Sequence, residues 1–90
     1  MPEPKAYLIP LDCLQAGECG LIRDYAGHED VLYRLRELGL VRGTRITVRR
    51  FAPLGDPMEL RVRGYHLSIR KKDASLLLVE KTACVRGASA

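Results

Sequence analysis

The period of the hydrophobic pattern changes several times along this chain, and each change predicts the boundary of an element. From residue 29 to residue 38 the apolar side chains recur at the spacing of a half-buried helix. The apolar positions of this segment are Val31, Leu32, Leu35 and Leu38. Glu29 and Asp30 stand at its start, where carboxylates interact favourably with the helix dipole. The pattern therefore predicts one amphipathic helix beginning here.

A glycine marks the end of this helix. Gly39 stands where a helix commonly ends with a residue at positive φ, which glycine adopts without a Cβ penalty. Leu40 is expected to fold back on Leu35, the apolar contact that accompanies such an ending. A turn containing Gly43 then leads into the next element. We assign structural roles to Leu35, Leu38, Gly39 and Gly43.

Two segments with a period of two follow the helix. Residues 45–49 and 58–63 each place apolar side chains on one face and mainly charged ones on the other, as half-buried strands do. Residues 52–57 cannot continue either strand, because their two prolines lack amide donors and fix φ. We expect a hairpin with a long, stiff loop, in which Gly55 and Pro57 have structural roles.

The remaining apolar runs are short. They are residues 7–9, 21–25, 67–69 and 76–79, of which the last three predict strands. Residues 11–14 are expected to form one helical turn, and Asp73 is expected to cap another. About five strands and one inserted α-helix predict a mostly β fold (α+β by content), arranged as a small, partly open β-barrel. The predicted core residues are Leu21, Ile22, Val31, Leu35, Leu38, Ile46, Val48, Leu60, Val62, Leu67, Ile69, Leu77 and Val79.

An ordered set of residues in this pattern resembles a known family. The run RLxELGLxxGTxIxV, followed by APLGDP and an alternating strand, resembles FeoA, the small cytoplasmic protein of bacterial ferrous iron transport. The matching residues are Arg34, Leu35, Glu37, Leu38, Gly39, Leu40, Gly43, Thr44, Ile46, Val48, Ala52, Pro53, Leu54, Gly55, Asp56 and Pro57. The resemblance implies an SH3-like barrel and an accessory protein that docks on the membrane transporter FeoB. The same unit forms the C-terminal domain of some metal-dependent repressors.

Length and composition agree with one small domain. The chain has 90 residues, of which 47% are hydrophobic and 29% are charged. We expect a flexible N-terminus at residues 1–6, a single domain at 7–81 and a flexible tail at 82–90. The chain contains no apolar run of the ~20 residues that span a bilayer, and its first residues do not resemble a signal peptide. We therefore expect a cytoplasmic protein that is not inserted in a membrane.

The cysteines and histidines suggest neither a catalytic centre nor a strong metal site. Cys13, Cys19 and Cys84 are an odd number without a recognisable disulfide framework, which favours an intracellular protein and leaves the state of the three cysteines open. The separation of Cys13 from Cys19 exceeds the usual spacing of structural zinc ligands. No motif surrounds a Cys/His nucleophilic pair. We therefore expect no enzyme and no cofactor, with His28 and His66 as weak surface candidates for a transition metal.

The basic residues are the feature of the sequence that most favours nucleic-acid binding. The formal net charge is +4, and four arginines are expected to share the outward face of the hairpin. They are Arg45, Arg49, Arg61 and Arg63, with Lys71 and Lys72 as an extension. Glu59 interrupts this face, and the chain has no Trp and no interleaved aromatic residues on which bases would stack. We therefore interpret these basic residues as a solvated face that protects a sheet edge, or as a face that binds a protein partner, rather than as a nucleic-acid-binding face.

The predicted docking element is the helix end with its exit loop and the stiff hairpin loop. The residues assigned to partner binding are Arg34, Leu40, Val41, Arg42, Phe51 and Leu54, with the apolar members expected to be exposed. The alternatives are a nucleic-acid-binding SH3-like module and a detached metalloregulator domain that binds transition metals weakly. No helix-turn-helix pattern precedes the barrel, which disfavours the second alternative. Weak self-association is left open.

Overall fold

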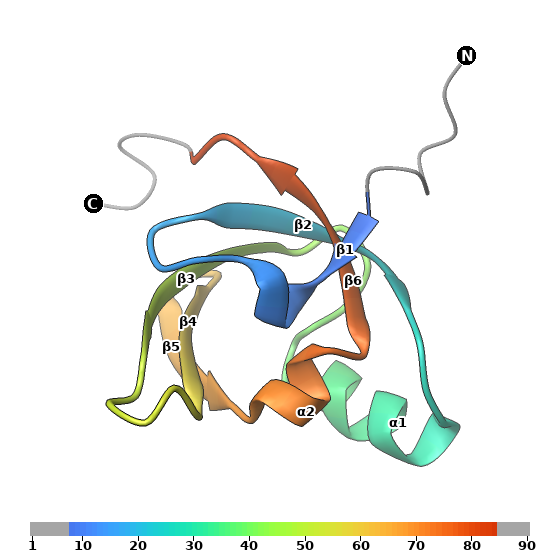
Figure 1. Ribbon diagram of the computed structural model, residues 1–90. Helices are drawn as coiled ribbons and strands as arrows, with labels where there is room; N and C mark the ends of the chain where they lie inside the picture. Colours follow the sequence, from blue (N-terminus) through green and yellow to red (C-terminus); the bar gives the residue numbers. More distant parts are fainter. Residues whose placement is uncertain (1–7, 85–90) are drawn as a thin grey trace.

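Six antiparallel strands form one curled sheet in the computed structural model, which describes residues 8–84 (Figure 1). The strands are β1 (Leu8–Pro10), β2 (Cys19–Tyr25), β3 (Arg45–Phe51), β4 (Met58–Val62), β5 (Tyr65–Ile69) and β6 (Leu77–Thr82). Their order across the sheet is β1-β6-β2-β3-β4-β5. Within the described residues β1 and β5 are not paired with each other, so the sheet is a partly open barrel, as the sequence predicts.

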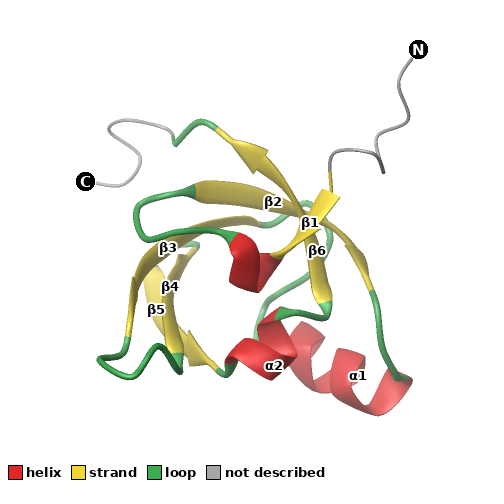
Figure 2. Ribbon diagram, in the orientation of Figure 1, coloured by secondary structure: helices red, strands yellow, loops and turns green. Residues whose placement is uncertain are grey.

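Three helical segments connect the strands. They are the 3-10 turn η2 (Leu11–Cys13), helix α1 (Glu29–Glu37) and the short helix α2 (Lys71–Ala74). Figure 2 shows both α-helices, in red, at the same end of the curled sheet. An ion pair joins them there, because Arg34 Nη2 of α1 lies 3.4 Å from Asp73 Oδ2 of α2.

Most predicted elements are confirmed, with differences at their ends. The prediction of five strands missed β1, a three-residue edge strand that pairs with β6. Strand β2 begins at Cys19, before the predicted start at Leu21, because Cys19 and Gly20 pair with both β3 and β6. Strand β6 runs to Thr82, one residue into the segment expected to be a flexible tail. The expected flexibility of residues 1–6 and 85–90 lies outside the described residues.

The core lies inside the curled sheet and is closed by η2 and the two α-helices. The buried hydrophobic side chains are Leu11, Leu14, Cys19, Ile22, Leu32, Leu35, Leu40, Ile46, Val48, Met58, Leu60, Val62, Ile69, Ala74, Leu77 and Val79. Three of the expected core residues are only half-buried: Leu21, Val31 and Leu67. Leu38 was also expected in the core, but 39% of it is exposed because it follows the last helical turn.

The helix ends as predicted, in a left-handed turn at Gly39. Gly39 has φ of +96°, and its amide donates to the carbonyl of Arg36 at 2.9 Å. The amide of Leu40 donates to the carbonyl of Leu35 at 3.2 Å, which completes the paired hydrogen bonds of a Schellman motif. Leu40 was expected to be exposed for partner binding. That expectation is wrong, because the reversal carries its side chain into the core, where it is 0% exposed.

Two tyrosines fasten this helix end to the sheet. The hydroxyl of Tyr25, at the end of β2, donates to the carbonyl of Leu40 at 3.0 Å. The hydroxyl of Tyr65, at the start of β5, donates to the carbonyl of Leu38. Since the last carbonyls of a helix lack partners within the helix, these contacts satisfy acceptors near its end and fix α1 against two distant strands.

Alanine substitutions at Gly39 and Gly43 should separate backbone strain from this tyrosine contact. Both glycines have positive φ, but only at Gly39 would a Cβ collide with a neighbour, the hydroxyl of Tyr65. Gly43→Ala should lower the free energy of unfolding by about 1–2 kcal/mol through strain. Gly39→Ala should cost about 1 kcal/mol more, because it also displaces a hydrogen bond. Urea denaturation measures both values.

The Tyr65→Phe background provides the control for this comparison. It removes the colliding oxygen and leaves the ring carbon Cζ at 3.6 Å from the added Cβ, an ordinary contact. In this background the two alanine substitutions should cost the same within about 0.5 kcal/mol. A difference that persists there would show that the Tyr65 hydroxyl does not constrain the helix end.

Candidate docking surface

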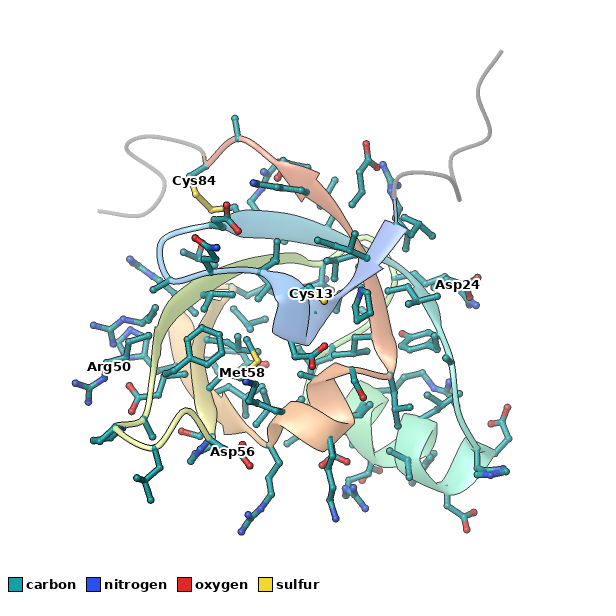
Figure 3. The ribbon with its side chains drawn as sticks, in the orientation of Figure 1. Cys13, Asp24, Arg50, Asp56, Met58 and Cys84 are labelled. Carbon is teal, nitrogen blue, oxygen red and sulfur yellow. A yellow bond between two sulfur atoms is a disulfide. The ribbon has the colours of Figure 1, made fainter. Side chains whose placement is uncertain are left out.

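The structure separates the six residues predicted to bind a partner. Leu40 is buried, and Arg42 lies beside β2, where its Nη2 is 3.0 Å from Asp24 Oδ1. Leu54 lies in the loop between β3 and β4, close to Asp56. Figure 3 shows Asp24 and Asp56 on opposite sides of the molecule. The predicted set therefore forms two separate regions, one at the exit from α1 and one at the β3–β4 loop.

The β3–β4 loop presents a leucine to solvent on a constrained backbone. Leu54 is 96% exposed, more than any other large hydrophobic residue in the described part of the chain. The amide of Ala52 donates to the carbonyl of Pro57 at 2.9 Å, and the amide of Gly55 donates to the carbonyl of Ala52 at 2.6 Å. Pro53 and Pro57 further restrict φ on each side of Leu54. The loop thus holds an apolar side chain outward with little freedom to fold it away.

Helix α2 is hydrogen-bonded to this loop. Asp56 Oδ1 accepts a hydrogen bond from the amide of Lys71 at 2.9 Å, which caps the first residue of α2 from a distant loop. Asp73 was expected to be the cap, but it lies inside the helix, and the N-cap residue Arg70 has no side-chain cap. Sequence reasoning missed Asp56 because a capping acceptor that lies 15 residues away in the chain leaves no local pattern.

Side chains on α2 connect the loop with α1. Lys71 Nζ lies 5.4 Å from the centroid of the Phe51 ring, within the range of a cation–π contact. Asp73, two residues further along α2, pairs with Arg34 of α1. We call Arg34, Phe51, Leu54, Lys71 and Asp73 the loop surface. It includes three of the predicted residues, Arg34, Phe51 and Leu54, which are linked through α2 and the β3–β4 loop.

The exit from α1 forms a different kind of surface. Two guanidinium groups lie over the ring of Tyr25, with Arg42 Cζ at 5.0 Å and Arg36 Cζ at 5.8 Å from its centroid. Arg42 also donates from Nε to the carbonyl of Arg23 at 3.3 Å. Val41 is half-buried. The polar groups here are engaged with one another, and neither Val41 nor the buried Leu40 provides an exposed apolar anchor.

The outward face of the β3–β4–β5 hairpins is less uniformly basic than the sequence suggests. Arg50 Nε donates to Glu59 Oε1 at 2.9 Å, and this hydrogen bond lowers the pKa of Glu59 and raises that of Arg50. Arg49 Nη1 lies 3.1 Å from His66 Nδ1. Arg63 was expected on this face, but it belongs to the turn between β4 and β5, with φ of +49°. The other two arginines expected on this face, Arg45 and Arg61, lie on the neighbouring strands β3 and β4.

Metal-binding groups are scattered in the described residues. No cluster of three or more His, Cys, Asp or Glu side chains that could hold an ion occurs between residues 8 and 84. His28 is exposed at the N-cap of α1, and His66 is exposed on β5. Cys13 is an exposed free thiol rather than a buried one, whereas Cys19 and Cys84 form a disulfide. The sequence left the state of the cysteines open, and the sheet brings together two of them that are 65 positions apart.

None of the helices between residues 8 and 84 is long and apolar enough to cross a membrane. The described residues define a small SH3-like β-barrel of six strands with one inserted helix. The family model described as the FeoA domain matches residues 9–81. This chain belongs to the FeoA family, as its sequence resemblance predicts.

Solved structures support the same conclusion. A FeoA-like protein from Clostridium acetobutylicum is 34% identical with a TM-score of 0.81, and the match covers 89% of this chain and 93% of that protein. FeoA from Stenotrophomonas maltophilia, described as an SH3 domain protein and complexed with zinc, is 24% identical with a TM-score of 0.68. That match covers 78% of this chain and 87% of that protein, and it supports the fold alone.

A longer relative contains a similar segment. The Fe(2+) transport protein A/Fe(2+) transporter FeoB fusion protein of Porphyromonas gingivalis is 37% identical over 67 residues. The match covers 74% of this chain, which spans only 8% of the length of that relative.

Removal of metal should leave the domain folded. The core consists of apolar side chains. The described residues contain no group of His, Cys, Asp or Glu side chains that could hold a metal ion on which folding depends. Treatment with EDTA should shift the melting temperature by less than about 2 °C in circular dichroism melts. A fall of about 5 °C or more, reversed by added zinc or ferrous iron, would reveal a structural metal site.

Proposed function

We propose that this protein is a non-enzymatic, cytoplasmic accessory protein of bacterial ferrous iron uptake that docks on a FeoB-type transporter and modulates it. The observation that carries the proposal is the exposed Leu54 at the tip of a constrained loop. An apolar side chain with 96% exposure contributes nothing to the stability of the isolated domain, whereas its burial in a partner would be favourable.

The rigidity of the loop favours binding at this position. Association normally loses free energy when loops and side chains become ordered, and a loop that is already constrained loses less. Energetic anchors in protein interfaces are typically apolar side chains that fill a pocket and are surrounded by charged groups at the rim. Leu54 fits the first role. Lys71, whose amide is bonded to Asp56 of the same loop, fits the second.

The choice of partner rests on the fusion relative. In the Porphyromonas gingivalis protein, a segment similar to this chain is covalently joined to a FeoB transporter. Covalent linkage raises the effective concentration of two modules, so modules that work in contact are suited to fusion. A separate chain of the same family would need a docking surface to achieve the same proximity.

Nucleic acid is the second candidate, and the basic residues of the outer sheet face favour it. Phosphate contacts give an affinity that falls steeply with salt. However, Arg50 is paired with Glu59, and Arg63 lies in a turn, where its Nη2 is 3.4 Å from Thr44 Oγ1. Tyr65, the exposed aromatic residue of β5, has its hydroxyl bonded to the end of α1. The face therefore lacks an array of free cations and stacking rings.

Replacement of Leu54 by Glu should abolish docking. A carboxylate at an apolar contact must be desolvated without a partner, so affinity for detergent-solubilised FeoB of the same organism should fall about thirtyfold or more. Biolayer interferometry at physiological salt measures this change. Leu40→Glu is unsuitable for the purpose, because it would place the charge in the core.

Tyr33→Glu provides the matched control. Tyr33 is 61% exposed on α1, so this variant also places a carboxylate at an exposed aromatic or aliphatic position outside the loop surface. It should bind FeoB within about threefold of the wild type. Equal losses in both variants, or unchanged binding by Leu54→Glu, would contradict the proposed surface. Micromolar binding to mixed oligonucleotides, with no binding to FeoB, would favour the nucleic-acid function instead.

A further inference from the structure

The disulfide between Cys19 and Cys84 connects the first residue of β2 with the segment that follows β6. Cys19 is 2% exposed, whereas Cys84 is exposed. Figure 3 shows the yellow sulfur–sulfur bond at Cys84, where the last described residues lie beside the start of β2. The bond therefore joins a buried residue to an exposed one, and its Cys84 side is the one that faces solvent.

The buried sulfur has a hydrogen-bond donor beside it. Thr47 of β3 is the residue directly opposite Cys19 in the β2–β3 register. The Thr47 hydroxyl oxygen lies 3.2 Å from Cys19 Sγ, so it can donate to that sulfur. The hydroxyl would stabilise negative charge on Cys19 more than it stabilises the neutral disulfide, because hydrogen bonds to charged groups are stronger.

We propose that Cys19–Cys84 is a reversible thiol–disulfide exchange site whose co-substrate is a low-molecular-weight thiol such as glutathione. The thiolate of the first thiol attacks the exposed Sγ of Cys84, forming a mixed disulfide and breaking the protein S–S bond. The bonding electron pair leaves on Cys19, which accepts the hydrogen bond from Thr47 and then takes up a proton.

A second thiol completes the exchange. Its thiolate attacks the external sulfur of the mixed disulfide, and Cys84 leaves as a thiolate that is then protonated. Two thiols are thus oxidised to one low-molecular-weight disulfide, and the protein gains two electrons and two protons. Oxidation by the same low-molecular-weight disulfide runs these steps in reverse, so the site needs no further reactant.

Reduction would loosen the end of the described chain. Beyond the β2–β6 pairing of Cys19 with Thr82, this segment is held by Arg45 and by the contact of Cys84 Sγ with the Gly17 carbonyl at 3.4 Å. Arg45 Nη1 donates to Thr82 Oγ1 at 3.3 Å and to the Ala83 carbonyl at 3.4 Å, both long for hydrogen bonds. Without the S–S bond, only these long contacts would hold Ala83 and Cys84, so the two residues would separate from the sheet more easily and free the guanidinium of Arg45 on β3.

The exchange site does not depend on docking to a transporter. It does match the proposed context, because ferrous iron persists under reducing conditions and is oxidised under aerobic ones. A thiol pair responds to the same change in conditions. In that setting the reduced domain would hold Ala83 and Cys84 less tightly and would have one more free arginine, Arg45, than the oxidised domain.

Thiol counting and thermal melts of the full chain test the proposal. Air-oxidised protein unfolded in guanidinium should show one reactive thiol, from Cys13, and reduced protein should show three. Because the bond closes a loop across most of the chain, reduction should lower the melting temperature by on the order of 10 °C. Cys84→Ser should melt like the reduced protein in both conditions, while Cys13→Ser should keep the full shift.

Two further measurements separate an exchange site from a permanent cross-link. Titration with mixtures of reduced and oxidised glutathione should convert the protein reversibly between the two forms. Thr47→Val should slow reduction by glutathione about tenfold, and Thr47→Ser should restore the rate, because it retains the hydroxyl. Three free thiols after air oxidation, a bond that resists every glutathione ratio, or an unchanged rate in Thr47→Val would overturn the proposal.

Discussion

The left-handed reversal at Gly39 fixes the inserted helix to the barrel. Gly39 allows the amide of Leu40 to return to the carbonyl of Leu35, and the same reversal buries the side chain of Leu40. The carbonyls of Leu38 and Leu40 then accept hydrogen bonds from Tyr65 and Tyr25, which belong to strands far apart in the sheet. One backbone conformation therefore determines where α1 lies against β2 and β5.

A fixed α1 also determines the surface available to a partner. Arg34 of α1 pairs with Asp73 of α2, and the first amide of α2 is capped by Asp56 from the β3–β4 loop. This series of contacts holds the loop that presents Leu54. The docking proposal thus depends on the helices and the loop, while apolar side chains fill the interior of the barrel.

Local patterns in the sequence predict the elements well, but not the contacts between distant segments. The helix, its glycine ending and the stiff loop follow from periodicity and from glycine and proline chemistry, which act within a few residues. The glycine ending predicts that Leu40 folds back on Leu35, but its complete burial depends on the distant strands that cover it, and the sequence does not reveal these. The Cys19–Cys84 bond and the Asp56 cap depend on tertiary approach, which leaves no spacing signal.

Hydrogen–deuterium exchange on the complex with FeoB tests the docking account most directly. The account predicts slower exchange of the amides at residues 52–57 and in α2, and unchanged exchange at residues 40–43 and across β3, β4 and β5. Such a footprint would place the partner on the loop surface. Slower exchange confined to the strands of the basic sheet face, or to the exit from α1, would contradict the account.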